Sequence, residues 1–149
     1  MQVKEILRVK GNRLISAEPG GRAVDAVKTM ADQNLGSLVV LDQGRMVGML
    51  TFHELFAALA KRSGALGDVT VGDIMVKDPV TATPDMEVND LRRTMLDTSA
   101  RYLPVMQDGK LLGVIYPGRG QGGAGRAGLR EQDAQGLYQE LACLIFSRS

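Results

Sequence analysis

The chain has 149 residues, of which 44% are hydrophobic and 23% charged, and its formal net charge is +1. These values are ordinary for a globular protein, and they give no overall field that would recruit nucleic acid or a membrane surface. Residues 1–7 lack the apolar core of a signal peptide, and no apolar run approaches the ~18 residues of a membrane span. The single Cys143 cannot form an internal disulfide, so we expect a cytoplasmic protein.

The residues that most often carry catalysis or bind metals are scarce. One histidine, His53, and one cysteine leave little for a zinc site or for a Ser/His/Asp or Cys/His arrangement. No G-x-x-x-x-G-K-S/T phosphate loop is present. We therefore expect no enzyme, no catalytic residue and no metal site, and we interpret His53 as a solvent-facing helix residue.

Hydrophobic spacing in the first half of the chain predicts six short elements before a linker at residues 63–68. They are a turn of helix at 3–7, a strand at 14–17, a helix at 23–35, strands at 38–41 and 46–50, and a helix that begins at Thr51. The two later strands are joined by Asp42-Gln43-Gly44, a typical turn sequence. The helix from Thr51 is expected to place Leu55, Phe56, Leu59 and Ala60 on its apolar face.

The same order of elements returns in the second half of the chain. At a constant offset in numbering and without a gap, residues 16–50 overlay residues 81–115, and a strand is expected at 80–83. Identical pairs include Ala17/Ala82, Pro19/Pro84, Asp25/Asp90, Met30/Met95, Leu38/Leu103, Val40/Val105, Gly44/Gly109 and Gly48/Gly113. Because neither unit can bury its strand face alone, we predict an α/β fold of two β-α-β-β-α repeats that pack sheet to sheet about a pseudo-twofold axis.

The overlay ends at Ile115, where the second repeat is truncated or altered. Six of the thirteen residues 116–128 are glycine, each of which costs about 1 kcal/mol in a helix relative to alanine. We therefore divide the chain into a first repeat with its N-terminal segment (1–66), a second repeat without a recognisable C-terminal helix (67–116) and a Gly/Arg-rich tail (117–149).

Three interpretations of this tail are open. If the codons allowed from Tyr116 onward are read one base later, they permit I-R-D-V-V-K-A-V-L-E-E-Q, a helical sequence where the repeat requires a helix. We therefore hypothesise that the chain from about residue 116 is an out-of-frame translation. The first alternative is a native linker followed by a helix, since apolar residues recur with helical spacing at Ala134, Leu137, Tyr138, Leu141, Leu144 and Ile145. Binding of RNA is least favoured, because the glycine run holds two arginines and no aromatic residue after Tyr116.

The repeated pattern resembles a known family. Two ordered copies of β-α-β-β-α, each with a glycine hairpin and a V/L-G-hydrophobic-hydrophobic strand, the first followed by T-x-x-acid, are similar to a tandem cystathionine-beta-synthase (CBS) domain pair. Such a pair is also called a Bateman module, and the resemblance, to small stand-alone bacterial-type proteins, covers residue 1 to about 116. It implies a non-catalytic regulatory module that senses AMP, ADP, ATP, S-adenosylmethionine or NADH in the cleft between two repeats, with no required cofactor.

The resemblance also implies partners and contact residues. It implies a homodimer and an effector protein, whereas the alternative is a structural or dimerisation module without ligand. In the family, a T/S-x-x-D acid accepts hydrogen bonds from the ribose hydroxyls, which assigns Thr51 and Glu54 here. Because Thr-x-x-Glu is also a helix capping box, we favour the cap as the main role of Glu54.

The other residues that the resemblance assigns to ligand binding lie on strand edges: Ile15, Ser16, Ala17, Val80, Thr81, Ala82, Arg101 and Pro104. Core packing is the stronger interpretation of Ile15 and Val80. Arg101 can reach a ligand phosphate or remain solvated. Arg92 and Arg93 are interpreted as a solvated helix face, and the methionines at apolar repeat positions as core residues.

Overall fold

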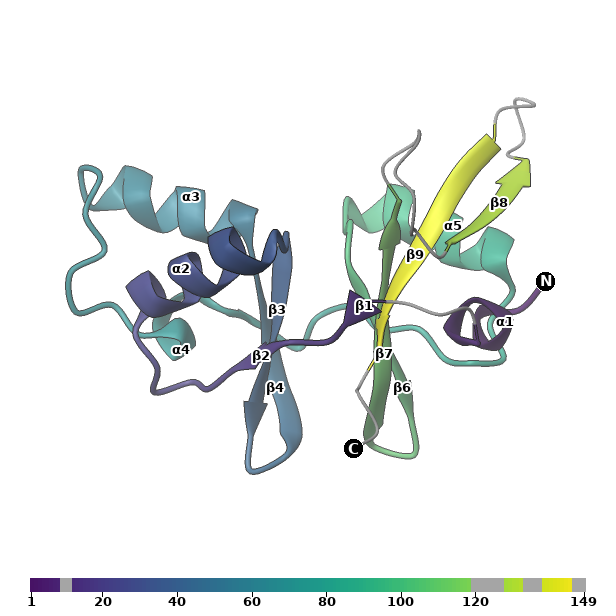
Figure 1. Ribbon diagram of the computed structural model, residues 1–149, viewed down its shortest axis with the longest axis horizontal. Helices are drawn as coiled ribbons and strands as arrows, with labels where there is room; N and C mark the ends of the chain where they lie inside the picture. Colours follow the sequence, from purple (N-terminus) through teal and green to yellow (C-terminus); the bar gives the residue numbers. More distant parts are fainter. Residues whose placement is uncertain (9–11, 119–127, 133–137, 146–149) are drawn as a thin grey trace. The chain divides into compact units, whose positions relative to one another are not determined.

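The computed structural model describes residues 1–8, 12–118, 128–132 and 138–145, and the chain divides into two compact units (Figure 1). Residues Ile15–Pro79 form one, which we call the central unit. Met1–Leu14 and Val80–Ser149 form the other, which we call the terminal unit. Residues 1–14 therefore fold with the second repeat and residues 67–79 with the first, so the compact units differ from the sequence repeats at these two segments.

The central unit is a four-stranded sheet with its main helices on one face (Figure 1). The sheet has the order β2-β3-β4-β5, in which β2 and β3 are parallel and the other pairs antiparallel. In chain order the elements are β2 (Ser16–Ala17), α2 (Ala23–Gln33), β3 (Ser37–Asp42), β4 (Arg45–Thr51), α3 (Phe52–Lys61), α4 (Val71–Ile74) and β5 (Val76–Lys77).

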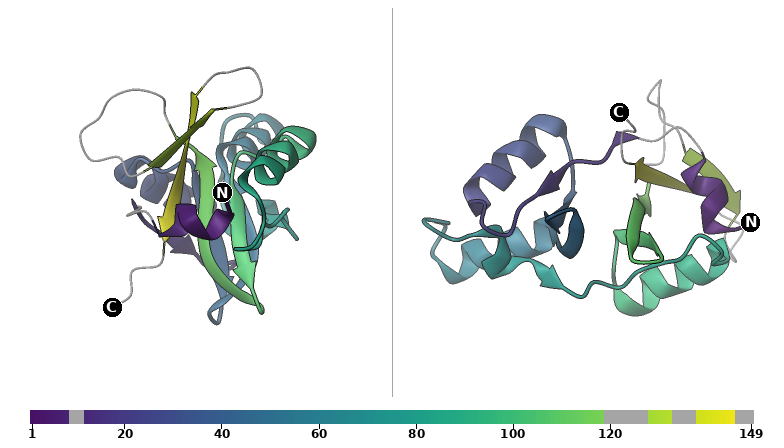
Figure 2. Two further views of the ribbon diagram at one scale, coloured as in Figure 1. Left: turned by 90° about the vertical axis from the view of Figure 1, so that its right-hand side faces the viewer. Right: turned by 90° about the horizontal axis from the view of Figure 1, so that it is seen from below.

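The terminal unit has a five-stranded sheet of order β1-β9-β7-β6, with β8 paired to β9 outside this path. Both views in Figure 2 place β8 beside β9, in agreement with their antiparallel pairing. In chain order the elements are α1 (Val3–Leu7), β1 (Asn12–Arg13), α5 (Val88–Thr98), β6 (Leu103–Gln107), β7 (Lys110–Pro117), β8 (Gly128–Gln132) and β9 (Tyr138–Ile145).

The predicted repeat is confirmed by the backbone. Helices α2 and α5 begin at equivalent repeat positions and end at equivalent repeat positions, and the parallel pair Ala17 and Val40 recurs as the bridge between Ala82 and Val105. Both hairpins turn through two residues of positive φ, the second of them Gly44 in one unit and Gly109 in the other. Glycine adopts this conformation without a steric penalty, which explains why it recurs at the same repeat position.

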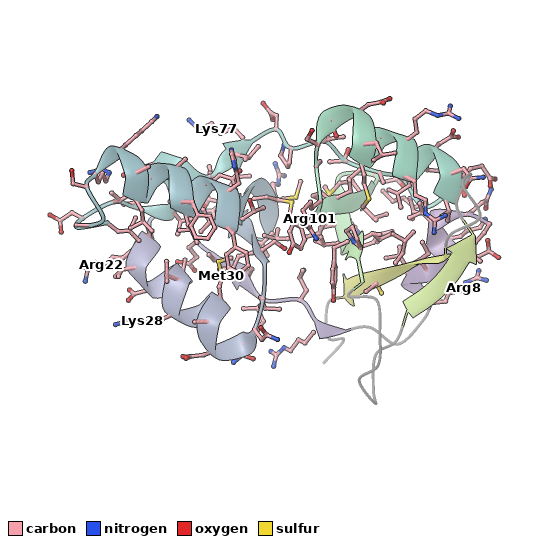
Figure 3. All side chains as sticks on the ribbon, turned by 90° about the horizontal axis from the view of Figure 1, so that it is seen from above. Arg8, Arg22, Lys28, Met30, Lys77 and Arg101 are labelled. Atoms are coloured by element: carbon pink, nitrogen blue, oxygen red, sulfur yellow. The ribbon has the colours of Figure 1, made fainter. Side chains whose placement is uncertain are left out.

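The two cores are built from the same repeat positions. The core of the central unit includes Ala26, Met30, Leu38, Val40 and Leu50, and the core of the terminal unit includes their equivalents Leu91, Met95, Leu103, Val105 and Ile115. Met30, labelled in Figure 3, is 2% exposed, in agreement with the core role expected for this methionine. Each unit therefore buries one stripe of its long helix against one face of its own sheet.

Short helices at the start of each repeat complete the cores. Val3 and Ile6 of α1 are buried in the core of the terminal unit, while Val71 of α4 is buried in that of the central unit. Backbone hydrogen bonds fix α1, because Val3 N donates to Met86 O over 2.8 Å. These contacts explain why the N-terminal segment belongs with residues that follow it much later in the chain.

The two units differ after Tyr116, as the sequence predicts. Among the described residues, α3 of the central unit has no helical counterpart in the terminal unit. Strand β9 pairs with β7 at Gly113, the repeat position at which β4 pairs with β5 through Gly48. Within its described residues, the tail therefore contributes two strands, β8 and β9, to the sheet and no helix over it.

The helix predicted from the spacing of apolar residues in the tail is wrong where the structure describes it. Residues Tyr138–Ile145 form strand β9, and Ala134 and Leu137 lie outside the described residues. Leu141 and Cys143, two positions apart, are both buried, which is the period of a strand with one face inward. Hydrogen-bonded pairing with β7 therefore determines the structure of this segment, although its apolar residues are spaced as in a helix.

Three side chains on the helices depart from their predicted environments. Phe56 is 66% exposed and Ala60 is also exposed, because α3 buries Leu55 and Ala58 instead. Arg92 is buried, whereas Arg93 lies on the solvated face as expected. Arg92 falls four residues after Val88 and so joins the helical stripe that faces the core.

The strand predicted at residues 80–83 is reduced to one bridge, between Ala82 and Val105. A two-residue strand, β5, forms instead at Val76–Lys77, where the sequence analysis expects none. Val80 is 40% exposed, so its interpretation as a core residue is wrong.

Candidate functional site

Three predicted contact residues, Ser16, Thr51 and Glu54, lie at one end of the central sheet. Strands β2 and β3 are parallel and start there, and the antiparallel β4 ends there. Ser16 pairs with Val39, and Ser37 at the start of β3 lies opposite Thr51 at the end of β4. Glu54 follows in the first turn of α3. We call this the β4 end of the central sheet.

Thr51 and Glu54 form the capping box that the sequence predicts. The Glu54 carboxylate oxygen Oε2 accepts hydrogen bonds from the Thr51 backbone N, over 2.7 Å, and from the Thr51 hydroxyl. The Thr51 hydroxyl oxygen in turn accepts from the backbone N of His53 over 3.3 Å, and His53 itself is exposed. Both bonds to the carboxylate end on Oε2, so within the described residues Oε1 of Glu54 stays open to a further donor.

Ser37 is a polar residue of this site that the sequence analysis missed. It is 2% exposed, and its hydroxyl oxygen has no hydrogen-bond partner within the described parts of the chain. Because directly opposed residues of an antiparallel pair point to the same face of the sheet, Ser37 and Thr51 share a face. A buried hydroxyl without a partner costs about 1–3 kcal/mol, and the described residues supply no partner for this one.

The signal that could have identified Ser37 is its repeat position. It precedes Leu38 directly, one of the positions identical in the two repeats, and it is the small polar residue opposite the Thr51 of the T-x-x-acid motif. This relation depends on the register between strands, which hydrophobic spacing alone does not fix.

The neighbouring predicted residues offer apolar and backbone contacts. Ile15 and Ala17 are half-buried and pack against the core of the central unit, while Ser16 is exposed. Residues before and within β2 therefore alternate in burial beside β3, as is typical of a strand with one face toward the core.

The predicted residues of the terminal unit lie at the equivalent end of its own sheet. Ala82 and Pro104 are buried and joined by a hydrogen bond from Ala82 N to Pro104 O over 2.8 Å. Val80, Thr81 and Arg101 are exposed, and Arg101 is labelled in Figure 3. The structure therefore brings Ala82 and Pro104 together, and it leaves the Arg101 side chain on the surface of its unit.

Two tyrosines occupy the positions that Ser37 and Thr51 hold in the other repeat. Tyr102 and Tyr116, at these equivalent positions, stack with ring centroids 5.8 Å apart and an interplanar angle of 30°. Both rings are half-buried. The position equivalent to Glu54 is Arg119 in the sequence, which lies outside the described residues.

The rest of the described chain offers no metal centre. In residues 1–8, 12–118, 128–132 and 138–145, no group of three or more His, Cys, Asp or Glu is placed to hold a metal ion. In the same ranges no helix is long and apolar enough to cross a membrane.

The chain is similar to proteins of one family over most of its length. The family model described as "CBS domain" matches residues 3–61 and 71–118, so the match ends where the tail begins. An uncharacterized 17.7 kDa protein of Acidianus ambivalens is 34% identical over 113 residues, which cover 74% of this chain and 67% of that protein. The chain spans about half the length of other curated relatives that it matches.

Solved structures agree with this relation. The crystal structure of CBSX2 in complex with AMP has a TM-score of 0.65 and 25% identity, and covers 77% of this chain and 89% of that one. The CBS domain pair of protein MJ0100, in complex with 5′-methylthioadenosine and S-adenosyl-L-methionine, has a TM-score of 0.67 and 25% identity, with coverage of 78% and 89%. Two matched segments in one chain and the repeat in its backbone lead to one conclusion: the chain belongs to the CBS domain family, as a tandem pair of CBS repeats.

Proposed function

We propose that this chain is a non-catalytic regulatory module that binds an adenosine-containing ligand at the β4 end of the central sheet. The observation that carries this proposal is the Thr51–Glu54 box at the start of α3, in which both hydrogen bonds to the Glu54 carboxylate end on Oε2. Further support comes from two similar CBS structures that contain AMP or S-adenosylmethionine.

The proposed contacts involve three parts of the ligand. The open oxygen Oε1 of Glu54 accepts a hydrogen bond from a ribose hydroxyl, and the Ser37 hydroxyl bonds a neighbouring polar atom of the ligand. Ile15 and Ala17 offer apolar surface for the adenine ring, with the backbone of Ser16 between them. Because the Glu54 cap persists in this arrangement, the same carboxylate stabilises α3 and binds the ligand.

By the repeat, the terminal unit offers a second place for a ligand. It consists of the equivalent segment Val80–Ala82 with Pro104, and Arg101 supplies a cation for a phosphate group.

A thermal-shift panel with AMP, ADP, ATP, S-adenosylmethionine and NADH tests the proposal. A ligand present at about 100 times its dissociation constant stabilises the folded state by roughly 2.7 kcal/mol, so one member of the panel should raise the melting temperature by several degrees. The absence of a shift with every member of the panel, in this chain and in one with the restored reading frame described below, would contradict ligand binding.

The second candidate function is a structural or dimerisation module without a ligand. Phe52 and Phe56 favour it, because they are 45% and 66% exposed and stack on α3 with ring centroids 6.1 Å apart. An exposed pair of large apolar side chains is typical of an interaction surface. If the partner is a second copy of the chain, light scattering should give twice the monomer mass, and Phe52→Ser with Phe56→Ser should reduce it to one. A monomer for the unchanged protein would contradict the homodimer.

We also propose that the chain from about residue 116 is an out-of-frame translation of a native second helix. The family match ends at residue 118, and α3 has no counterpart among the described residues of the terminal unit. Sequencing the source gene tests this directly. The proposal expects that restoring the frame after the Ile115 codon, by two added bases or by one removed, yields a helical sequence, and that two added bases complete a codon for the first residue of an S/T-x-x-D start. A gene without such a reading would contradict it.

A further inference from the structure

We infer that the central unit has a docking surface that accepts the short helix α4 but not the short helix α1, although both helices dock in the same way on their own units. The juxtaposition that carries this inference is Gly72 of α4 against the backbone of Pro19. Ligand binding plays no part in this selection, and all the residues involved precede Tyr116.

The two short helices share one sequence pattern. Residues 2–7 read Q-V-K-E-I-L and residues 70–75 read T-V-G-D-I-M, so both have a polar cap, a valine, an acid and an isoleucine in the same order. Each helix begins with a capping box between its polar cap and its acid. The equivalent valines, Val3 and Val71, are at most 1% exposed. By pattern alone, either helix could therefore occupy either place.

The two helices also dock through the same backbone hydrogen bonds. In each unit, two successive N–H groups of the short helix donate to two carbonyl groups of the loop that precedes the long helix. These bonds, each 2.8 Å long, are Val3 N to Met86 O, Lys4 N to Pro84 O, Val71 N to Gly21 O and Gly72 N to Pro19 O. The four acceptors form two pairs of equivalent repeat positions. The backbone contacts therefore do not distinguish the two helices.

A close contact at Gly72 does distinguish them. A Cβ atom added to Gly72 would lie 3.0 Å from Pro19 O and 3.4 Å from Pro19 Cβ. Because Pro19 O also accepts the hydrogen bond from Gly72 N, it cannot move away without lengthening that bond. Gly72 is not among the glycines of positive φ, so space and not backbone conformation favours glycine here. Helix α1 has Lys4 at this position and would bring a Cβ atom and a long side chain into the contact.

Charge favours the observed docking of α1 on the terminal unit. Lys4 Nζ lies 3.4 Å from Asp85 Oδ1. The repeat position of Asp85 in the central unit is Gly20, which offers no carboxylate. The side chains of this ion pair are 44% and 76% exposed, so its contribution is small and the contact at Gly72 is the main determinant.

Selection between the two helices matters because the units are related repeats in one chain. While the chain folds, each of the two equivalent loops can meet either short helix. Docking of a segment on the wrong unit is a characteristic failure of repeat proteins. A contact that penalises the wrong partner provides the specificity that the shared pattern lacks.

A graft of the α1 sequence onto the central unit, within the whole chain, tests this inference. The full graft combines Thr70→Gln, Gly72→Lys, Asp73→Glu and Met75→Leu, and the matched control omits Gly72→Lys. Relative to the control, the full graft should melt about 3–10 °C lower by circular dichroism, as overpacking of a tight contact does. Intrinsic helix propensity predicts the opposite sign, because lysine is a better helix former than glycine.

Two single variants separate the contact from the charge. Gly72→Ala adds only the Cβ atom and should also lower the melting temperature of the otherwise unchanged protein. Lys4→Ala keeps a Cβ atom but removes the exposed ion pair, and should shift the melting temperature by less than about 2 °C.

Each outcome of these measurements decides for or against the selection. A full graft that melts at or above its control, or a Gly72→Ala protein that melts at or above the unchanged one, would overturn the inference. A full graft that does not fold, beside a control that does, would support it. Should neither graft fold, the direction of the shift in Gly72→Ala decides.

Discussion

Two helices of the central unit begin with the same hydrogen-bonded box. Thr51 and Glu54 form it at α3, and Thr70 and Asp73 form it at α4, where Thr70 N donates to Asp73 Oδ2 over 3.0 Å and Asp73 N to Thr70 Oγ1 over 3.2 Å. A box of this kind satisfies backbone N–H groups that the first turn of a helix leaves open. The boxes therefore fix where each helix starts.

The box at α4 predicts a pH dependence of stability. The hydrogen bond from the Thr70 backbone holds the pKa of the Asp73 carboxyl below its ordinary value, with the Thr70 hydroxyl as the next cause. A depressed folded-state pKa contributes stability above the unfolded pKa, and this is lost as the pH falls through the folded pKa. Unfolding by urea between pH 7 and pH 3 should show a shallower acid loss in Asp73→Asn, whereas the exposed Asp68→Asn should follow the unchanged protein. Equal acid slopes for Asp73→Asn and the unchanged protein would contradict the effect.

Replacing Ser37 by alanine is expected to affect stability and ligand binding in opposite directions. In Ser37→Ala the buried, unpartnered hydroxyl is removed, so the free energy of unfolding should stay equal or rise by up to about 1 kcal/mol. AMP affinity should fall about threefold to tenfold, because the ligand loses one neutral hydrogen bond. The exposed Ser63→Ala serves as the control and should change neither quantity. A Ser37→Ala protein that binds as before would remove Ser37 from the site.

At the scale of elements, the pairing of β4 and β5 depends on a close approach at Gly48. A Cβ atom added there would lie 2.6 Å from the Val76 carbonyl oxygen and 2.7 Å from Met75 Sδ. The backbone of β5 is fixed by its pairing with β4, so the contact cannot be relieved by a side-chain rotation alone. This explains why a residue without a side chain stands at position 48.

We predict that Gly48→Ala destabilises the protein by about 1–3 kcal/mol, as overpacking of a tight contact does. Gly20→Ala is the matched control, because a Cβ atom there meets nothing within 4 Å. Urea denaturation of both variants measures the difference. If the two midpoints coincide, the close approach of β4 and β5 is not a constraint on the fold.

Helix α1 is expected to stabilise the terminal unit although it precedes the central unit in sequence. Ile6 is 1% exposed in the core that contains Leu91 and Leu103, so Ile6→Ala should lower the free energy of unfolding by about 2–5 kcal/mol. Leu96→Ala is the control on α5, since Leu96 is 80% exposed and should change stability by less than about 0.5 kcal/mol. A small effect of Ile6→Ala would mean that α1 does not belong to this core.

Much of the fold of the whole molecule could be predicted from sequence, because the sequence pattern of most elements occurs in both repeats. The helices α2 and α5, the two hairpins and the capping box of Thr51 and Glu54 agree with the structure to within two or three residues. Local spacing did not predict that residues 1–14 fold with residues 80–149, since that depends on contacts between distant segments. It also misplaced Arg92 and Phe56, because hydrophobicity alone does not say which side of a helix meets the sheet.

The candidate site was predicted in part. Thr51 and Glu54 form a recognisable sequence motif. Ser37 could be assigned to the site only from the structure, which pairs it with Thr51 across β3 and β4. The stacked tyrosines likewise stand out because strand register shows that they occupy the positions equivalent to Ser37 and Thr51. Across the whole molecule, the two repeats therefore share a backbone and a core but differ in the residues at one end of each sheet.

Mapping of amide chemical shifts during a titration with AMP tests the central claim most directly. The proposed site predicts that the largest shifts occur at residues 15–17, at Ser37 and at residues 51–54, while Tyr102 and Tyr116 change little. S-adenosylmethionine, titrated in parallel, should shift the same set. Largest shifts at the tyrosine pair, or no shifts at all with either compound, would contradict a ligand site at the β4 end of the central sheet.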